Sequence, residues 1–175
     1  MPDSKLFVLD ADVFIAAHRS YYAFDIAPGF WSGLLQHAAS GEVLSIAQVL
    51  NDLKKGYDPK NPEDYDLLAQ WAISEFHPYF TKTDEPEVTE IYADMINWVF
   101  TNSSFPLAAK NEFADISDSW LIAYAKAKNA VLATNENKIK RTSKVPIPAI
   151  CRQFGVEYIN TFEMLRQLNI KLFSV

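Results

Sequence analysis

The stretch Lys5-Leu-Phe-Val-Leu-Asp-Ala-Asp12 joins a short apolar run to two acids, and it is the clearest indication of the fold class. The apolar part ends at Leu9 and has the length and composition of a fully buried strand. From Val13 the apolar residues recur at helical spacing, and Asp12 is placed to act as the helix N-cap. The segment therefore predicts a buried strand that leads directly into a helix, which is the unit from which α/β proteins are built.

The alternation of strand and helix continues to the end of the chain. Further strands are predicted at residues 43–46, 130–134 and 156–159. Apolar residues at helical spacing predict helices at residues 31–38, 49–53, 65–72, 85–100, 117–128, 148–154 and 161–168. Short strands separated by helices are typical of an α/β fold with a mostly parallel sheet.

The composition is that of one soluble domain spanning residues 1–175. A hydrophobic fraction of 49%, with 12 Phe, 8 Tyr and 4 Trp, excludes an intrinsically disordered chain. The single cysteine, Cys151, excludes an intrachain disulfide, and neither a signal peptide nor a membrane-spanning run is evident. We therefore expect a cytoplasmic protein that does not associate with membranes.

Acids gather where the predicted strands end. Asp10 closes the first strand, and Glu136 follows the third. Asp52 lies in the helix after the second strand, and Asp118 opens the helix before the third. Because ligands of parallel sheets bind beyond the carboxyl ends of the strands, we expect these four acids to form a catalytic site at that edge.

A site made only of carboxylates requires a counter-charge. Neighbouring carboxylates raise one another's pKa and cannot all stay ionised without a cation. Ligation by oxygen alone favours Mg²⁺ or Mn²⁺ over Zn²⁺. Such an ion activates water and binds the oxygens of a phosphodiester. The acids therefore predict metal-assisted phosphodiester hydrolysis without a covalent intermediate.

Each acid also has a purely structural explanation. Asp12 and Asp118 have the position of helix N-caps. Asp52 lies beside two lysines and fits a solvated helix face, and Glu136 fits a surface loop. Asp10 is harder to explain in this way, since a carboxylate at the end of a buried strand is costly unless it is paired or bound to metal. The hypothesis depends on several acids at strand ends taken together.

Three segments resemble the motifs of PIN-domain ribonucleases. The opening motif of that family is similar to Leu9-Asp-Ala-Asp-Val-Phe-Ile15, and the third is similar to Asp118-Ser-Trp-Leu-Ile-Ala-Tyr-Ala125. The fourth resembles Val131-Leu-Ala-Thr-Asn-Glu136. The motifs occur in the family's order over nearly the whole chain. The aromatic-rich segment Arg19–Trp31 is similar to a poorly characterised bacterial PIN subfamily.

The resemblance implies a three-layer α/β/α sandwich and metal-dependent cleavage of RNA. It implies that Asp10, Asp118 and Glu136 bind Mg²⁺ or Mn²⁺ and that Thr134 orients one of them. The family's second motif normally carries Glu where Asp52 aligns, and its fourth position is commonly Asp where this chain has Glu. These two departures would either shift the ion or weaken catalysis.

Two further acids near these motifs are candidates for the same site. Asp12 is expected to support it from the opening motif. Asp115, three residues before Asp118, is a candidate outer metal ligand.

The resemblance also implies partners, because family members are often the toxin of a toxin–antitoxin pair and are frequently dimeric. We therefore expect an RNA substrate, an antitoxin protein and a homodimer. Basic residues after the fourth motif are predicted to contact RNA phosphates: Lys138, Lys140, Arg141 and Lys144. The formal net charge of −6 opposes RNA binding, so binding is predicted to depend on the bound metal.

Two other functions remain open from the sequence. Asp10-Ala-Asp12 also resembles the nucleophile and acid pair of HAD-type phosphatases, although the later motifs occur in a different order. The departures at Asp52 and Glu136 would also suit a PIN fold that binds a partner without catalysis. A trapped aspartyl-phosphate would indicate the phosphatase, and metal-dependent RNA cleavage would exclude the binding module.

Overall fold

A parallel sheet forms the centre of the computed structural model, which describes residues 5–55, 60, 66–137 and 143–173. The strand order among these residues is β3-β2-β1-β4-β5, and every neighbouring pair is parallel. The strands are β1 (Phe7–Leu9), β2 (Val43–Ile46), β3 (Phe80–Thr81), β4 (Val131–Ala133) and β5 (Tyr158–Ile159). The parallel α/β sheet predicted from the sequence is therefore confirmed.

The strand β1 lies in the middle of the sheet. Phe7 pairs with Val43 on one side and with Val131 on the other, and Leu9 pairs with Ala133. All three residues of β1 are buried. Its unbroken apolar run follows from this position, because helices cover both faces of the strand.

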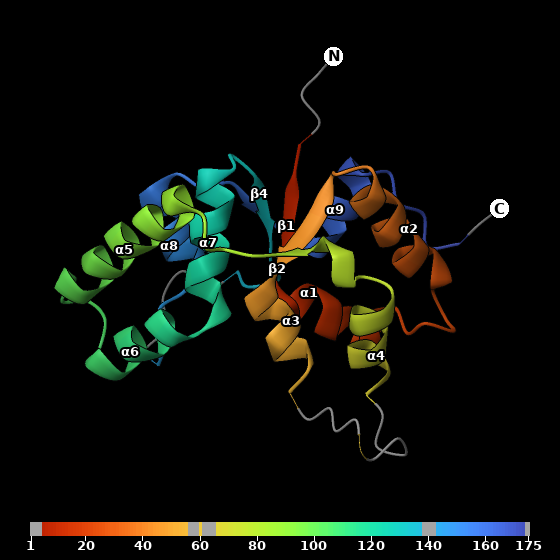
Figure 1. Cartoon of the computed structure of the whole chain (residues 1–175), viewed down its shortest axis with the longest axis horizontal. Helices are drawn as coiled ribbons and strands as arrows, with labels where there is room; N and C mark the ends of the chain where they lie inside the picture. Colours follow the sequence, from red (N-terminus) through yellow and green to blue (C-terminus); the bar gives the residue numbers. More distant parts are fainter. Residues whose placement is uncertain (1–4, 56–59, 61–65, 138–142, 174–175) are drawn as a thin grey trace.

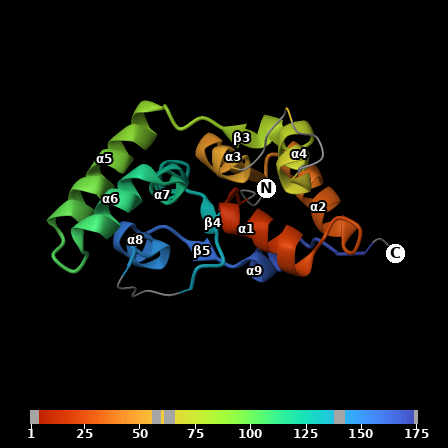
Figure 2. The same ribbon diagram turned by 90° about the horizontal axis from the view of Figure 1, so that it is seen from below.

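Two layers of helices cover the sheet (Figures 1 and 2). One layer contains α1 (Ala11–Ala16), α2 (Pro28–Ala39), α3 (Ala47–Leu53), α4 (Leu67–Ser74) and α9 (Thr161–Gln167). The opposite layer contains α5 (Pro86–Thr101), α6 (Leu107–Asp115), α7 (Ser117–Ala127) and α8 (Ile147–Phe154). Strand order reverses at β1, so right-handed crossovers place the helices between β1 and β3 on one face and those between β3 and β5 on the other. The expected three-layer α/β/α sandwich is confirmed.

Several local predictions were wrong. The sequence did not predict α6 or the two-residue edge strand β3. The prediction that Asp12 is an N-cap was also wrong, because β1 ends at Leu9 and α1 begins at Ala11, which puts Asp10 at the N-cap position. The predicted start of the helix at residue 65 lies outside the described residues, and α4 is described from Leu67.

Most of the aromatic-rich segment belongs to the core. Tyr22, Phe30 and Trp31 are buried, and the Trp31 indole donates a 2.6 Å hydrogen bond to the Tyr22 carbonyl. Tyr21 is exposed at the end of a π-helical turn that continues α1. Within the described part of the chain, no helix is both long and apolar enough to cross a membrane.

Candidate active site

The reversal of strand order at β1 defines where a ligand would bind. In open α/β sheets the crevice lies beyond the carboxyl ends of the two central strands, between β1 and β4 in this protein. Asp10 follows β1, and its backbone N–H continues the pairing by donating to the Ala133 carbonyl at 3.0 Å. The Asp10 side chain makes no capping hydrogen bond to α1 and is buried at the carboxyl end of the central strand.

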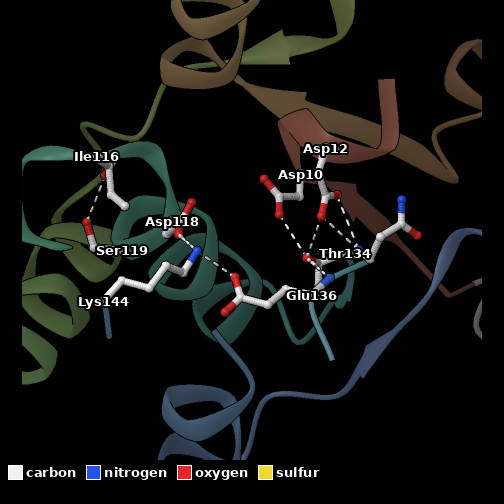
Figure 3. A network of polar contacts seen from close by, with 9 residues as sticks. Asp10, Asp12, Ile116, Asp118, Ser119, Thr134, Glu136 and Lys144 are labelled. Atoms are coloured by element: carbon white, nitrogen blue, oxygen red, sulfur yellow. Dashed lines mark hydrogen bonds and ion pairs between the residues drawn. The ribbon is translucent and has the colours of Figure 1, made fainter. Parts of the chain in front are cut away.

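Thr134, the first residue after β4, holds Asp10 in place. Its Oγ1 donates to Asp10 Oδ2 at 2.8 Å and accepts from the Glu136 backbone N–H at 3.2 Å (Figure 3). Thr134 Oγ1 also lies 3.4 Å from Asp12 Oδ2, but its single proton serves the shorter contact with Asp10. The hydroxyl thus couples the end of β1 to the loop after β4.

Asp12 lies in the first turn of α1 and is fixed by the same loop. The Asn135 backbone N–H donates to its two carboxylate oxygens at 3.0 and 3.2 Å. The Asn135 side-chain oxygen in turn accepts hydrogen bonds from the backbone N–H and the hydroxyl of Thr161 at 3.2 and 2.8 Å. Asn135 therefore ties Asp12 to the start of α9.

Two further acids reach the cleft from other elements. Asp118 comes from α7, in the opposite helical layer, and Glu136 comes from the loop after β4. Asp118 is buried in the first turn of α7, where the positive end of the helix dipole favours a carboxylate. The Glu136 side chain is only 7% exposed. The Lys144 ammonium lies 2.7 Å from Glu136 Oε2 and 3.7 Å from Asp118 Oδ2 (Figure 3). The other Glu136 oxygen, Oε1, is buried without a hydrogen-bond partner among the described residues.

Burial perturbs the acidity of three of these groups. It is the largest cause raising the pKa of Asp10 to about 7 and that of Asp118 to about 7. Burial also raises the pKa of Asp12 to about 6. Repulsion among the acids adds to each effect, and the Thr134 hydroxyl and the Lys144 ammonium oppose it for Asp10. Such a cluster is costly to ionise at neutral pH without an added cation.

The acids line one cleft of about 650 Å³. Asp52, from α3, lines it as well, and its carboxylate pairs with the Lys55 ammonium at 2.5 Å. Arg19, Ser20 and Lys55 also lie along the cleft. The acids therefore occupy a concave surface that basic side chains border.

The chemistry of this donor set fits a hard divalent cation, because every candidate ligand is a carboxylate and one buried carboxylate oxygen has no hydrogen-bond partner among the described residues. The spatial arrangement of these candidate ligands is less complete than a metal site requires. Within the part of the chain that the structure describes, no group of three or more His, Cys, Asp or Glu side chains is close enough together to hold a metal ion. The Lys144 ammonium lies between two of the candidate ligands.

The structure brings the four predicted catalytic acids, Asp12 and Lys144 to the cleft. Asp115 does not line it, because it is the exposed last residue of α6. Of the basic residues predicted to contact RNA, Lys138, Lys140 and Arg141 lie outside the described residues.

Sequence reasoning missed three parts of the site. Asn135 gave no signal beyond its place inside the fourth motif, and its bonds to Asp12 and Thr161 depend on tertiary structure. Arg19 follows Asp12 by seven residues and Lys55 follows Asp52 by three, spacings that could have suggested a shared helix face.

The family described as "Domain of unknown function (DUF4411)" matches residues 7–172 of this chain. No curated protein shows significant sequence similarity to it.

Three solved structures share the fold. A chain of FitAB bound to an IR36 DNA fragment is 19% identical with a TM-score of 0.54, over 89% of this chain and 94% of that chain. A chain of FitAcB from Neisseria gonorrhoeae is 19% identical with a TM-score of 0.54, over 90% and 99%. A chain of VapBC2 from Rickettsia felis, bound to a DNA fragment from their promoter, is 14% identical with a TM-score of 0.53, over 89% and 98%. The protein thus has the PIN-domain fold and belongs to the DUF4411 family.

Proposed function

We propose that the cleft is the active site of an endoribonuclease that hydrolyses RNA phosphodiester bonds and depends on Mg²⁺ or Mn²⁺. The observation that carries this proposal is the burial of Asp10, Asp118 and Glu136 around one cleft at the switch point of the sheet. Buried carboxylates with raised pKa values are costly for the fold, which favours a functional role over a structural one.

Asp10, Asp118 and Glu136 would hold the cation, with Asp52 at the edge of the set. When bound, Mg²⁺ or Mn²⁺ would supply the charge that activates water and stabilises the phosphodiester oxygens during displacement. Thr134 would keep the Asp10 carboxylate oriented through its 2.8 Å hydrogen bond, and Asn135 would do the same for Asp12.

The basic side chains along the cleft would bind the RNA backbone. Arg19 and Lys55 are largely exposed, and each also pairs with an acid, Asp66 at 4.0 Å and Asp52 at 2.5 Å respectively. Exposed ion pairs of this kind are weak, so both cations can turn towards a phosphate. Together with Lys144 they would offset the negative charge of the chain where the substrate approaches.

We also propose that the protein acts as the toxin of a toxin–antitoxin pair in the cytoplasm. Support comes from the resemblance of the sequence motifs to PIN-domain toxins and from the fold shared with chains of FitAB and VapBC2, both of which were solved bound to a DNA fragment. An antitoxin partner follows from that likeness, and a homodimer remains a prediction from the family resemblance.

The test is cleavage of several structured and single-stranded RNAs with Mn²⁺, compared with EDTA. We expect wild-type protein to cleave only with the metal, and Asp10→Asn and Asp118→Asn to lose activity. Asp94→Asn, an exposed acid of α5 outside the cleft, serves as the matched control and should cleave like wild type. If wild type and both site variants are equally inert while a partner still binds, the protein is a binding module.

A further inference from the structure

Lys144 lies inside the acid cleft, between two acids that come from different elements. Its ammonium approaches Glu136 Oε2 at 2.7 Å and Asp118 Oδ2 at 3.7 Å (Figure 3). The Lys144 side chain is 27% exposed, whereas those of Asp118 and Glu136 are 13% and 7% exposed. The Lys144 side chain is therefore more accessible than the two acids that it joins.

The carboxylates on the two sides of the cleft are stabilised in different ways. Asp10 and Asp12 accept hydrogen bonds from neutral donors, Thr134 and Asn135, and the Lys144 ammonium acts on Asp10 only through its charge, without a direct ion pair. Glu136 and Asp118 share the charge of Lys144. Buried carboxylates need such a charge, because their ionised forms lose the hydration that water would provide.

We propose that Lys144 is a built-in counter-ion that competes with the divalent cation for Glu136 and Asp118. The divalent cation would bind as the Lys144 ammonium leaves these two acids. The flexible four-carbon stem of lysine permits that movement. This inference rests on the metal site of the proposed function. It is consistent with the incomplete ligand geometry among the described residues, since the Lys144 ammonium already contacts two of the candidate ligands.

A purely structural role for the Lys144 ion pairs predicts the opposite change in Mn²⁺ affinity. If Lys144 only held Glu136 in position for the metal, removing it would weaken metal binding. If Lys144 competes with the metal, removing it leaves the acids without a counter-charge and strengthens metal binding. The sign of the change in Mn²⁺ affinity therefore separates the two roles.

The experiment is a calorimetric titration of the metal-free protein with Mn²⁺, for wild type and Lys144→Met. We expect Lys144→Met to bind Mn²⁺ about tenfold more tightly, on the order of what one nearby unit charge contributes at a partly exposed site. The matched control is Lys128→Met, because Lys128 is 29% exposed, pairs with Glu85 and lies at the opposite end of α7. That variant should bind Mn²⁺ like wild type.

A second readout needs no substitution. Acylation of the Lys144 amine in wild-type protein, measured by mass spectrometry, should increase when Mn²⁺ is added, because the amine leaves the two carboxylates. Acylation of Lys128 should not change. This readout keeps the inference testable if Lys144→Met does not fold.

The outcomes are distinct. Tighter Mn²⁺ binding by Lys144→Met, or acylation of Lys144 that rises with Mn²⁺, supports the inference. Equal or weaker binding by a folded Lys144→Met protein, or acylation unaffected by Mn²⁺, overturns it and leaves the proposed metal site intact. Absence of Mn²⁺ binding in both wild type and variant overturns the metal site itself, and the inference with it.

Discussion

At the residue scale, Thr134 shows how one hydroxyl connects two catalytic candidates. It donates to Asp10 and accepts from the Glu136 backbone N–H. We predict that Thr134→Val lowers the rate of RNA cleavage by about 10–100-fold, because groups that orient a metal ligand have effects of this size. Thr134→Ser keeps the hydroxyl and should retain most of the activity. Equal cleavage rates for the valine and serine variants would contradict this role.

The raised pKa values of the buried acids predict how stability depends on pH. Asp10 and Asp118 have pKa values of about 7 in the folded protein, raised from 3.8, so between these values the folded protein holds protons that the unfolded chain has released. The stabilisation is complete below the unfolded pKa and is lost as pH rises through the folded pKa. We therefore predict that the contribution of these two groups to the Tm of metal-free protein falls as pH rises from about 4 to about 7.

The measurement is a series of thermal melts in EDTA, with Asp10→Asn as control. The variant lacks one of these titrations and should show a smaller decrease in Tm over the same range. With Mn²⁺ present the trend should weaken or reverse, because metal binding strengthens as carboxylates lose protons. A wild-type Tm that depends on pH no more than that of Asp10→Asn would refute the explanation.

At the element scale, the strands that build the site were predictable and some outer elements were not. The apolar runs of β1 and β4 are buried on both faces, so composition alone indicated strands. The two-residue strand β3 is too short for any periodicity. The helix α6 buries Lys110 beside Ala109 and Phe113, and the Lys110 ammonium donates to the Phe100 carbonyl at 2.9 Å. A charged residue on the buried face hid the apolar pattern of α6.

The contact between α2 and the C-terminal segment gives a prediction at this scale. The Gly29 N–H donates to the Leu172 carbonyl at 3.1 Å, and a Cβ at Gly29 would lie 2.4 Å from that oxygen. We predict that Gly29→Ala destabilises the protein by about 1–3 kcal/mol through this overlap, which lowers Tm by roughly 2–10 °C. Ser32→Ala, an exposed change on the same helix, should leave Tm nearly unchanged. Similar melting temperatures for the two variants would contradict the predicted overlap.

At the scale of the whole molecule, the topology explains which site residues the sequence could indicate. Asp10 and Glu136 follow strands whose carboxyl ends meet at the switch point, so a general rule for parallel sheets was enough to bring them together. Asp118 was suggested by its place at the start of a helix. The position of Lys144 between Asp118 and Glu136 depends on how the chain returns after β4, and no local pattern encodes that path.

The proposed function requires that the buried acids of one cleft hold a divalent cation for RNA hydrolysis. The most direct measurement is anomalous diffraction from crystals of the protein soaked in Mn²⁺. We predict an anomalous peak in the cleft bounded by Asp10, Asp118 and Glu136, absent from Asp118→Asn crystals treated in the same way. A wild-type crystal with no peak in that cleft at saturating Mn²⁺, or with peaks only elsewhere, would contradict the proposed metal site.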